Sequence, residues 1–303
     1  MPLAYLDRRP TGAATLGALA ISFSAILFRL AHVSPSTGAF YRCAFAVPPL
    51  LLAAAFEDRA LGRRPRRDRA WAAVAGLFLV ADLVLWHHAV ESVGAGLGTV
   101  LGNTQVVLVA LVAWLLLGER PGGRTVAAIP VVFGGVVLIS GAVGHGAYGS
   151  NPRVGVVYGV LTGVAYTGFL LTLRQGSGGG HAAGPLSDAT LVCAIGVIPV
   201  GYAVGDLDWS PGWAAIGWLL VLALTSQVLG WLLISFSLPR LPAAVASVLL
   251  TSQPVASVVF AVLLLDESPS WVQLVGAATI LSGLVLVSTR RERVAGAPVA
   301  EAG

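Results

Sequence analysis

Several side chains that can carry a charge lie inside long, largely hydrophobic stretches of the first third of the chain. The three considered first are Arg42, Asp82 and His87. An ionised side chain in an apolar phase costs about 2.5–3.5 kcal/mol or more, so such a residue usually pairs with an opposite charge, binds a ligand or carries a proton. A guanidinium binds a carboxylate in fork geometry, and a buried carboxylate can bind an amine or a proton. The three residues therefore indicate a buried site for a small polar or charged molecule.

Each of these side chains also has an explanation that involves no ligand. Arg42 lies about six residues from the predicted outer end of its helix, so its long stem could reach the lipid headgroups. Asp82 could pair with Arg42 or with a serine. His87 and His88 point about 100° apart on a helix and do not suit a single metal ion. His88 could pair with Glu91 three residues on, and a pH-sensing histidine stays open as an alternative.

Uncharged polar and aromatic side chains recur in the middle of several other hydrophobic stretches. Gln105 and Gln253 occupy equivalent positions in two similar segments of the chain, which a symmetric binding site would produce. Hydrogen bonds between helices, worth about 0.6 kcal/mol each, are the competing explanation. With Arg42, Asp82 and His87, the candidate substrate-binding or coupling residues are Trp86, Asn103, Gln105, Tyr158, Thr162, Tyr166, Gln227, Trp231 and Gln253.

The composition places these residues in a membrane. Of the 303 residues, 56% are hydrophobic and only 11% are charged, and the mean hydropathy is +0.85. Soluble domains carry about 25% charged residues. Apolar runs of about 20 residues can cross the hydrocarbon core, and only a helix satisfies its own backbone hydrogen bonds there. The sequence predicts an all-α polytopic membrane protein without a soluble domain. The ten predicted spans are 12–31, 36–56, 70–90, 95–117, 124–142, 154–174, 187–206, 213–237, 242–265 and 270–288.

The distribution of arginine predicts the orientation of these spans. The chain has no lysine, and with the N-terminus inside, fifteen arginines fall in cytoplasmic segments while only Arg153 falls in an external loop. Because cytoplasmic loops favour positive residues, we expect both termini on the cytoplasmic side of the cell membrane. The same arginines beside anionic lipid explain the net charge of +4 without a nucleic-acid partner.

Two parts of the chain are copies of one unit. Aligned without a gap, residues 94–140 and 242–288 are identical at 15 of 47 positions. The segments around Cys43 and Cys193, 150 residues apart, are also similar in sequence. We expect these two cysteines at opposite depths in the membrane, without a disulfide between them. Each copy holds five predicted spans. Since five is odd, the second copy must cross the membrane in the opposite sense, which gives an inverted repeat suited to alternating access. The predicted repeats are residues 1–146 and 147–303.

Several short motifs follow one another in a distinctive order. Arg42 lies early in the second span, Glu119 and Arg120 follow the fourth, and the second copy holds Gln253–Pro254 and then Asp266–Glu267. In this order and spacing the chain resembles the EamA-like branch of the drug/metabolite transporter superfamily, over essentially its whole length. One departure is Val106, where the family often has a proline. A proline kink is therefore not expected in the fourth span.

The resemblance implies ten helices in two inverted five-helix repeats around a central cavity. It also implies secondary transport, usually outward, of small organic metabolites such as amino acids. The expected partners are a small-molecule substrate, the lipid bilayer and, as a candidate coupling ion, a proton; the oligomeric state is not fixed by the sequence. The sequence holds no phosphate-binding loop, ATPase segment or metal-ligand cluster, so we expect neither a cofactor nor an enzyme. The alternatives are an intramembrane enzyme built on Asp82, His87 and His88, and a non-transporting accessory membrane subunit.

Overall fold

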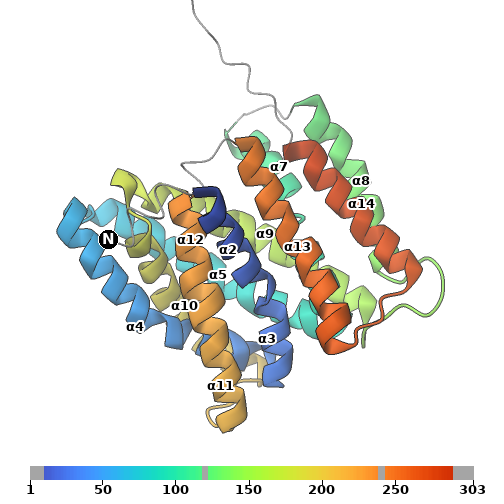
Figure 1. Ribbon diagram of the computed structural model, residues 1–303, viewed down its shortest axis with the longest axis horizontal. Helices are drawn as coiled ribbons and strands as arrows, with labels where there is room; N and C mark the ends of the chain where they lie inside the picture. The colour runs from blue at the N-terminus through green and yellow to red at the C-terminus, as the bar shows by residue number, and fades with distance from the viewer. Residues whose placement is uncertain (1–9, 118–121, 238–242, 289–303) are drawn as a thin grey trace, which may run out of the picture.

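Ten helical segments cross the molecule side by side (Figure 1). The computed structural model describes residues 10–117, 122–237 and 243–288, and the regular structure in these ranges is entirely helical. Six of the segments have the length and hydropathy of a membrane span by themselves, and shorter apolar helices make up the others. The prediction of an all-α protein with ten spans is confirmed. In chain order the segments are α2–α3 (Pro10–Ser22 and Ser24–Ala31), α4 (Pro35–Leu61), α5 (Arg66–Val93), α6–α7 (Ala95–Gly102 and Gln105–Leu117), α8 (Gly123–Ile139), α9 (Pro152–Gly176), α10 (Ala183–Val204), α11–η2–α12 (Trp213–Leu222, Ala223–Gly230 and Trp231–Ser237), α13 (Ala243–Leu265) and α14 (Trp271–Ser288).

The two sides of the molecule are named here by the ends of the chain. The terminal face is the side on which α2 begins and α14 ends, at the top of Figure 1, and the far face is the opposite side. A short 3₁₀ turn, η1 (Gly178–Gly180), connects α9 to α10 at the terminal face.

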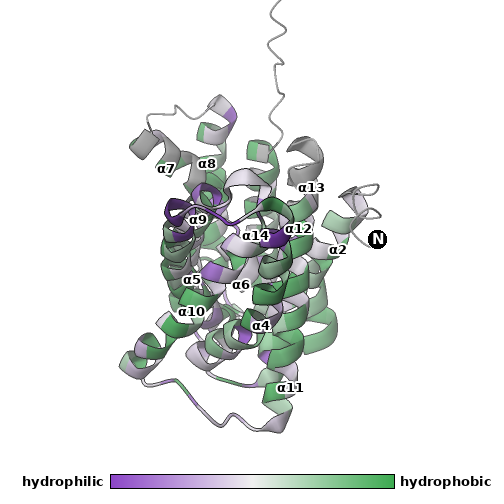
Figure 2. Cartoon of the chain, turned by 90° about the vertical axis from the view of Figure 1, so that its left-hand side faces the viewer, coloured by the Kyte–Doolittle hydropathy of each residue, from purple (hydrophilic) through white to green (hydrophobic). Residues whose placement is uncertain are grey.

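The outward surface of the helices is apolar. Figure 2 shows that hydrophobic residues colour most of the helical surface, while hydrophilic residues gather mainly at the ends and in loops. Phe133 and Ile195 are 69% and 61% exposed on the sides of their helices, where lipid would cover them. Trp213 and Trp271, at the first positions of their helices on the far face, are also exposed. These positions agree with a membrane span flanked by interfacial tryptophans.

Equivalent helices of the two predicted repeats pack against one another. The second span, α4, packs on the seventh, α10; α8 packs on α14; and α6 packs on α13. The third span, α5, packs on the sixth, α9, as the eighth (α11–η2–α12) packs on the first (α2–α3). Exchanging the first five spans with the second five therefore leaves this pattern of helix pairs unchanged.

The fourth span is broken, although it lacks the proline. Its helix is interrupted at Asn103 and Thr104, between α6 and α7. Asn103 Nδ2 donates to the carbonyl oxygen of Thr99 at 2.8 Å, and Thr104 Oγ1 donates to that of Leu101 at 2.7 Å. Such side-chain bonds compete with the backbone ladder. The fourth span therefore lacks a proline, as the sequence showed, but its helix is interrupted at two polar residues, which the sequence analysis did not predict.

The two cysteines form no disulfide, as expected, but they do not lie at the opposite depths that the sequence predicted. Cys43 and Cys193 are free, fully buried thiols in one cluster between α4 and α10. Helix α10 begins at Ala183 rather than at the predicted residue 187, so Cys193 lies about 15 Å along its helix from the terminal face. Cys43 lies at a similar distance from the far face, since α4 begins there at Pro35. Both therefore lie near mid-depth, where the two helices meet.

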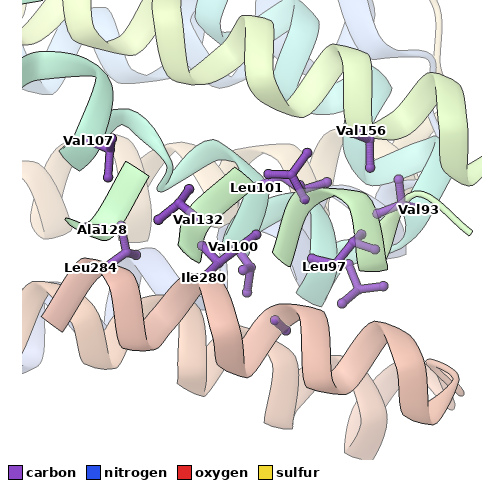
Figure 3. Packing of buried hydrophobic residues seen from close by; sticks show 13 residues of the cluster. Val93, Leu97, Val100, Leu101, Val107, Ala128, Val132, Val156, Ile280 and Leu284 are labelled. Atoms are coloured by element: carbon purple, nitrogen blue, oxygen red, sulfur yellow. The ribbon is translucent and has the colours of Figure 1, made fainter. Parts of the chain in front are cut away.

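A buried apolar cluster fixes α6 and α7 against α8, α9 and α14. Figure 3 shows Leu97, Val100 and Leu101 of α6 within a cluster that also holds Val132 of α8, Val156 of α9 and Ile280 of α14. The cluster holds one side of the fourth span in place. Its other side is left for the polar residues described below.

The close approach of α8 and α14 depends on glycine. A Cβ atom at Gly135 would lie 2.6 Å from the carbonyl oxygen of Gly276 and 2.7 Å from a side-chain carbon of Ile280. We expect Gly135→Val to destabilise the protein by about 1–3 kcal/mol, because the helices must separate. The measurement is the melting temperature in detergent. The control is Gly134→Val, since nothing lies within 4 Å of a Cβ atom at Gly134; equal melting temperatures for the two variants would contradict the close contact.

Candidate functional site

A cavity of about 380 Å³ lies at the centre of the helices. Its walls come from both predicted repeats: Ser24 and Arg42 stand on the first two spans, and Trp231 and Gln253 on the eighth and ninth. Its lining is mostly apolar, with a few polar groups. The lining residues that the sequence predicted are Arg42, Asp82, Trp86, Asn103, Gln105, Thr162, Tyr166, Trp231 and Gln253.

Arg42 is held inside the protein rather than directed toward the lipid headgroups. Its side chain is 4% exposed. Nε donates to Gln227 Oε1 at 2.9 Å and Nη1 donates to Ser24 Oγ at 3.0 Å, while the guanidinium carbon lies 5.7 Å from the centre of the Trp86 ring. Gln227 Nε2 in turn donates to Thr190 Oγ1 at 3.2 Å. Contacts from three helices thus fix the guanidinium at the cavity wall. In this structure Arg42 does not reach outward to the lipid headgroups.

Asp82 faces the same cavity from α5. It is 7% exposed. Within the residues that the structure describes, its carboxylate makes no hydrogen bond and no ion pair within 4.0 Å, so the pairing with Arg42 or a serine that the sequence left open is not formed there. A buried carboxylate without a partner is unfavourable. The cavity at this point is therefore suited to a cationic group or a proton.

Three predicted residues do not line the cavity. Gln227 is buried behind Arg42 and acts on the site through it. His87 is fully buried, with its ring 4.1 Å from that of Phe28, because its position on α5 points away from Asp82. Tyr158 stacks on His88 at 4.9 Å. The pair expected between His88 and Glu91 is present at 4.0 Å.

Other residues of the site escaped the sequence argument. Ser24 and Thr190 complete the hydrogen bonds around Arg42 and Gln227. Thr99 lines the cavity and accepts a hydrogen bond from Ser257 Oγ at 3.2 Å. Serine and threonine are common in apolar helices, where they bond to their own backbone, so a single one carries no signal in the sequence.

The cavity is placed asymmetrically between the two faces. Toward the terminal face its lining extends to Ile234 and Leu284, three and four residues before their helices end. Toward the far face it stops at Thr99, where α6 and α13 are in contact. The same contact continues outward to Glu267, which is 2% exposed.

Glu267 is the one strongly buried carboxylate of the described loops. Its two oxygens accept from the backbone N–H groups of Ala95, at 2.7 Å, and Gly96, at 3.3 Å. Burial raises the pKa of this carboxyl above its usual range, and the two N–H donors and Arg29 oppose the shift. The group therefore binds a helix start while largely removed from water.

The polar groups of the cavity match the chemistry of ligand binding better than that of metal binding. Within the described ranges, no group of three or more histidine, cysteine, aspartate or glutamate side chains is placed to hold a metal ion. The fixed guanidinium of Arg42 and the carboxylate of Asp82, which has no hydrogen bond or ion pair to any described residue, can instead bind opposite charges of one small molecule.

Comparison with known proteins agrees with this architecture. The EamA-like transporter family matches the chain twice, at residues 11–141 and 153–289. The "Probable terminal-alkyne amino-acid exporter" of Streptantibioticus cattleyicolor is 28% identical over 264 residues, which cover 78% of this chain and 80% of that protein. The "Uncharacterized transporter YxxF" of Bacillus subtilis is 25% identical over 232 residues, which cover 75% and 72%.

A solved crystal structure has the same fold. It superposes with a TM-score of 0.63 over 91% of this chain and 95% of that chain, at 16% identity. The two family matches together span nearly all of the ten helical segments. The chain therefore belongs to the EamA-like transporter family and is a multi-pass membrane transporter.

Proposed function

We propose that the protein is a secondary transporter that exports small organic metabolites such as amino acids across the cytoplasmic membrane. The observation that carries the proposal is the central cavity with a fixed guanidinium, Arg42, and a carboxylate, Asp82, that has no hydrogen bond or ion pair to the described residues. These two groups complement the carboxylate and the ammonium of a zwitterion. The name of the Streptantibioticus relative, an amino-acid exporter, supports both the substrate class and the outward direction.

One nitrogen of the Arg42 guanidinium is available to bind substrate. Its Nε and Nη1 are occupied by Gln227 and Ser24, whereas Nη2 makes no hydrogen bond within the described residues. A substrate carboxylate at Nη2 would complete the donors of Arg42 in a site of low polarity, where charge-assisted hydrogen bonds are strong. The Asp82 carboxylate would bind the substrate ammonium. When no ammonium is bound, it would bind a coupling proton.

Alternating access between two inverted repeats, 1–146 and 147–303, is the proposed mechanism. It is supported by the two family matches, by the pairing of equivalent helices, and by the contact between α6 and α13 that lies between the cavity and the far face. In an inverted repeat, exchanging the conformations of the two halves converts one open side into the other. The arginine distribution supports a cytoplasmic terminal face and an external far face, so this conformation would be the inward-facing one.

The experiment that tests the function is transport in proteoliposomes. Purified protein should exchange labelled amino acids across the bilayer, and a proton gradient should change net flux if a proton is coupled. The panel should contain zwitterions, matched carboxylates without an amine and matched amines without a carboxylate. Equal flux in empty and protein-containing liposomes for every compound, with and without the gradient, would reject the proposal.

Gln227 should tune affinity without being essential. Replacing it by alanine removes the acceptor of Arg42 Nε and one partner of Thr190. We expect Gln227→Ala to raise the half-saturating substrate concentration about tenfold, which corresponds to about 1.4 kcal/mol and to one hydrogen bond to a charged group. The maximal rate should change little, because Ser24 still holds the guanidinium.

The matched control for this variant is Gln175→Ala, which alters an exposed glutamine at the end of α9. It should leave both transport parameters unchanged. A Gln227→Ala protein with wild-type affinity would show that Arg42 does not depend on this contact.

A further inference from the structure

The lining of the central cavity changes along the direction that joins the two faces. On four helical segments, a polar or aromatic lining residue is accompanied by an aliphatic one about one turn nearer the terminal face, which is about 4.5–6 Å along the helix. The four pairs are Ser24 and Ile21, Asp82 and Leu79, Tyr166 and Leu170, and Trp231 and Ile234. Leu284, four residues before the end of α14, also lies toward the terminal face. Among the described lining residues, this end of the cavity is therefore aliphatic.

The other polar lining residues lie toward the far face or at mid-depth. Arg42 and Thr99 are seven and four residues from the far-face ends of α4 and α6. Those at mid-depth in their spans are Asn103, Gln105, Thr162 and Gln253. The cavity thus has a polar end and an aliphatic end, and the two differ in the chemistry that they can bind.

The two charged groups give a bound amino acid a direction in the cavity. The guanidinium carbon of Arg42 lies 5.7 Å from the centre of the Trp86 ring. Asp82 precedes Trp86 by four residues on α5 and so lies about one turn nearer the terminal face. With its carboxylate on Arg42 and its ammonium at Asp82, an amino acid would direct the carboxylate toward the far face. Toward that face the cavity stops at Thr99, so the room for the substrate side chain lies toward the aliphatic end.

The aliphatic end suits a large apolar side chain. The whole cavity has a volume of about 380 Å³, and an apolar cavity of about 150 Å³ in a protein already admits benzene. A polar side chain placed among these aliphatic residues would give up hydrogen bonds to water without finding a partner. A large aliphatic or aromatic side chain would instead remove apolar surface from water.

We propose that the cavity selects amino acids with a large apolar side chain, which lies in the aliphatic end while the carboxylate lies on Arg42, and that Leu170 is one of the residues that determine this selectivity. The proposal rests on the proposed transport of amino acids and names the substrate class of the same site. Leu170 is half-buried at the cavity wall, so its side chain can be changed with less disturbance than that of the fully buried Leu79.

The test compares amino acids that differ only in the side chain. Glycine, serine, leucine and phenylalanine share the carboxylate and the ammonium, so Arg42 and Asp82 can bind each of them alike. The half-saturating concentration of each is measured as uptake into proteoliposomes that hold the purified protein. We expect the values for leucine and phenylalanine to be at least about tenfold lower than those for glycine and serine, as the burial of one large apolar side chain would give.

Two variants of Leu170 test its part in this selectivity. Leu170→Ala should raise the half-saturating concentration for phenylalanine about fourfold, the effect of one methylene group that is no longer buried. The value for glycine should stay nearly the same, because glycine has no side chain to contact Leu170. Leu170→Trp fills the aliphatic end and should raise the value for phenylalanine at least about tenfold, since one methylene group too many in an apolar pocket already has such an effect.

The matched control is Leu161→Ala on the same helix. Leu161 is nine residues earlier, which is two and a half turns, so it lies on the opposite side of α9. Its side chain is 45% exposed there. This variant should transport all four amino acids as the parent does, and the melting temperature in detergent shows whether each variant is folded.

Equal half-saturating concentrations for all four amino acids in the parent protein would overturn the proposed selectivity. The role of Leu170 would be overturned by an equal change for glycine and phenylalanine in Leu170→Ala, or by the same change in Leu161→Ala. If neither Leu170 variant folds, the series in the parent protein decides the matter. All of these failures occur with measurable flux, and they leave the proposed transport of amino acids intact. Absence of flux for every compound in the parent protein is the result that would remove the function itself.

Discussion

Replacing Arg42 by alanine is expected to abolish transport. The change removes the one cationic side chain among the described residues that line the cavity, and it leaves Gln227 and Ser24 without their shared partner. A substrate carboxylate bound to Arg42 would form a buried charge pair with it, and truncating one member of such a pair costs about 2–5 kcal/mol. We therefore expect the initial rate of uptake into proteoliposomes to fall at least about 30-fold at low substrate concentration, since 1.4 kcal/mol is a factor of ten.

Two further variants test whether the loss of transport is due to the guanidinium of Arg42 itself. Arg42→Lys keeps the charge but loses the fork of donors that reaches Gln227 and Ser24 together, so we expect partial activity. Arg59→Ala removes an exposed arginine at the end of the same helix and should transport normally. Wild-type flux in a folded Arg42→Ala protein would show that the guanidinium has a structural role only.

Replacing Asp82 by asparagine is expected to have the second large effect. The variant preserves the shape of the side chain but removes the charge that faces the cavity without a partner in the described residues. If the carboxylate binds the substrate ammonium, zwitterion flux should fall at least about 30-fold, for the energetic reason given for Arg42. A carboxylic acid that lacks the amine should lose much less, because it never used Asp82.

The same variant distinguishes amine binding from proton coupling. If Asp82 carries a coupling proton, Asp82→Asn should lose net transport driven by a proton gradient but keep exchange of labelled for unlabelled substrate. If it binds the amine, both should be lost. The control is Glu91→Gln, which neutralises an exposed carboxylate two residues before the end of α5. Normal net flux in Asp82→Asn would exclude both roles.

The two copies are expected to contribute unequally to recognition. The charged groups of the cavity lining, Arg42 and Asp82, both belong to the first five spans, and the second five provide Trp231, Gln253 and, behind the wall, Gln227. A cavity with this distribution can read substrate charge with one half and adjust affinity with the other. The helices of the two repeats can therefore pack symmetrically although the charged side chains of the cavity come from the first repeat.

Much of this architecture is determined by the sequence alone. The ten spans follow from hydropathy, because a helix is the one structure that crosses lipid without exposed backbone groups. The repeat is visible in the identities between 94–140 and 242–288. The cost of charge in an apolar helix is what singles out Arg42 and Asp82, and both line the cavity. These inferences need only composition, length and spacing.

Other features were decided only by the tertiary structure. Hydropathy does not fix the rotation of a helix that is apolar all round, so it could not separate Asp82, which faces the cavity, from His87, which is buried against Phe28. The partners of Arg42 come from residues 18 and 185 positions away, and the helix crossings that unite them depend on close packing. Glu267 reads in sequence as a loop residue beside water. Only the fold brings its carboxylate onto the start of α6, because the N–H groups it satisfies belong to a helix 172 residues earlier.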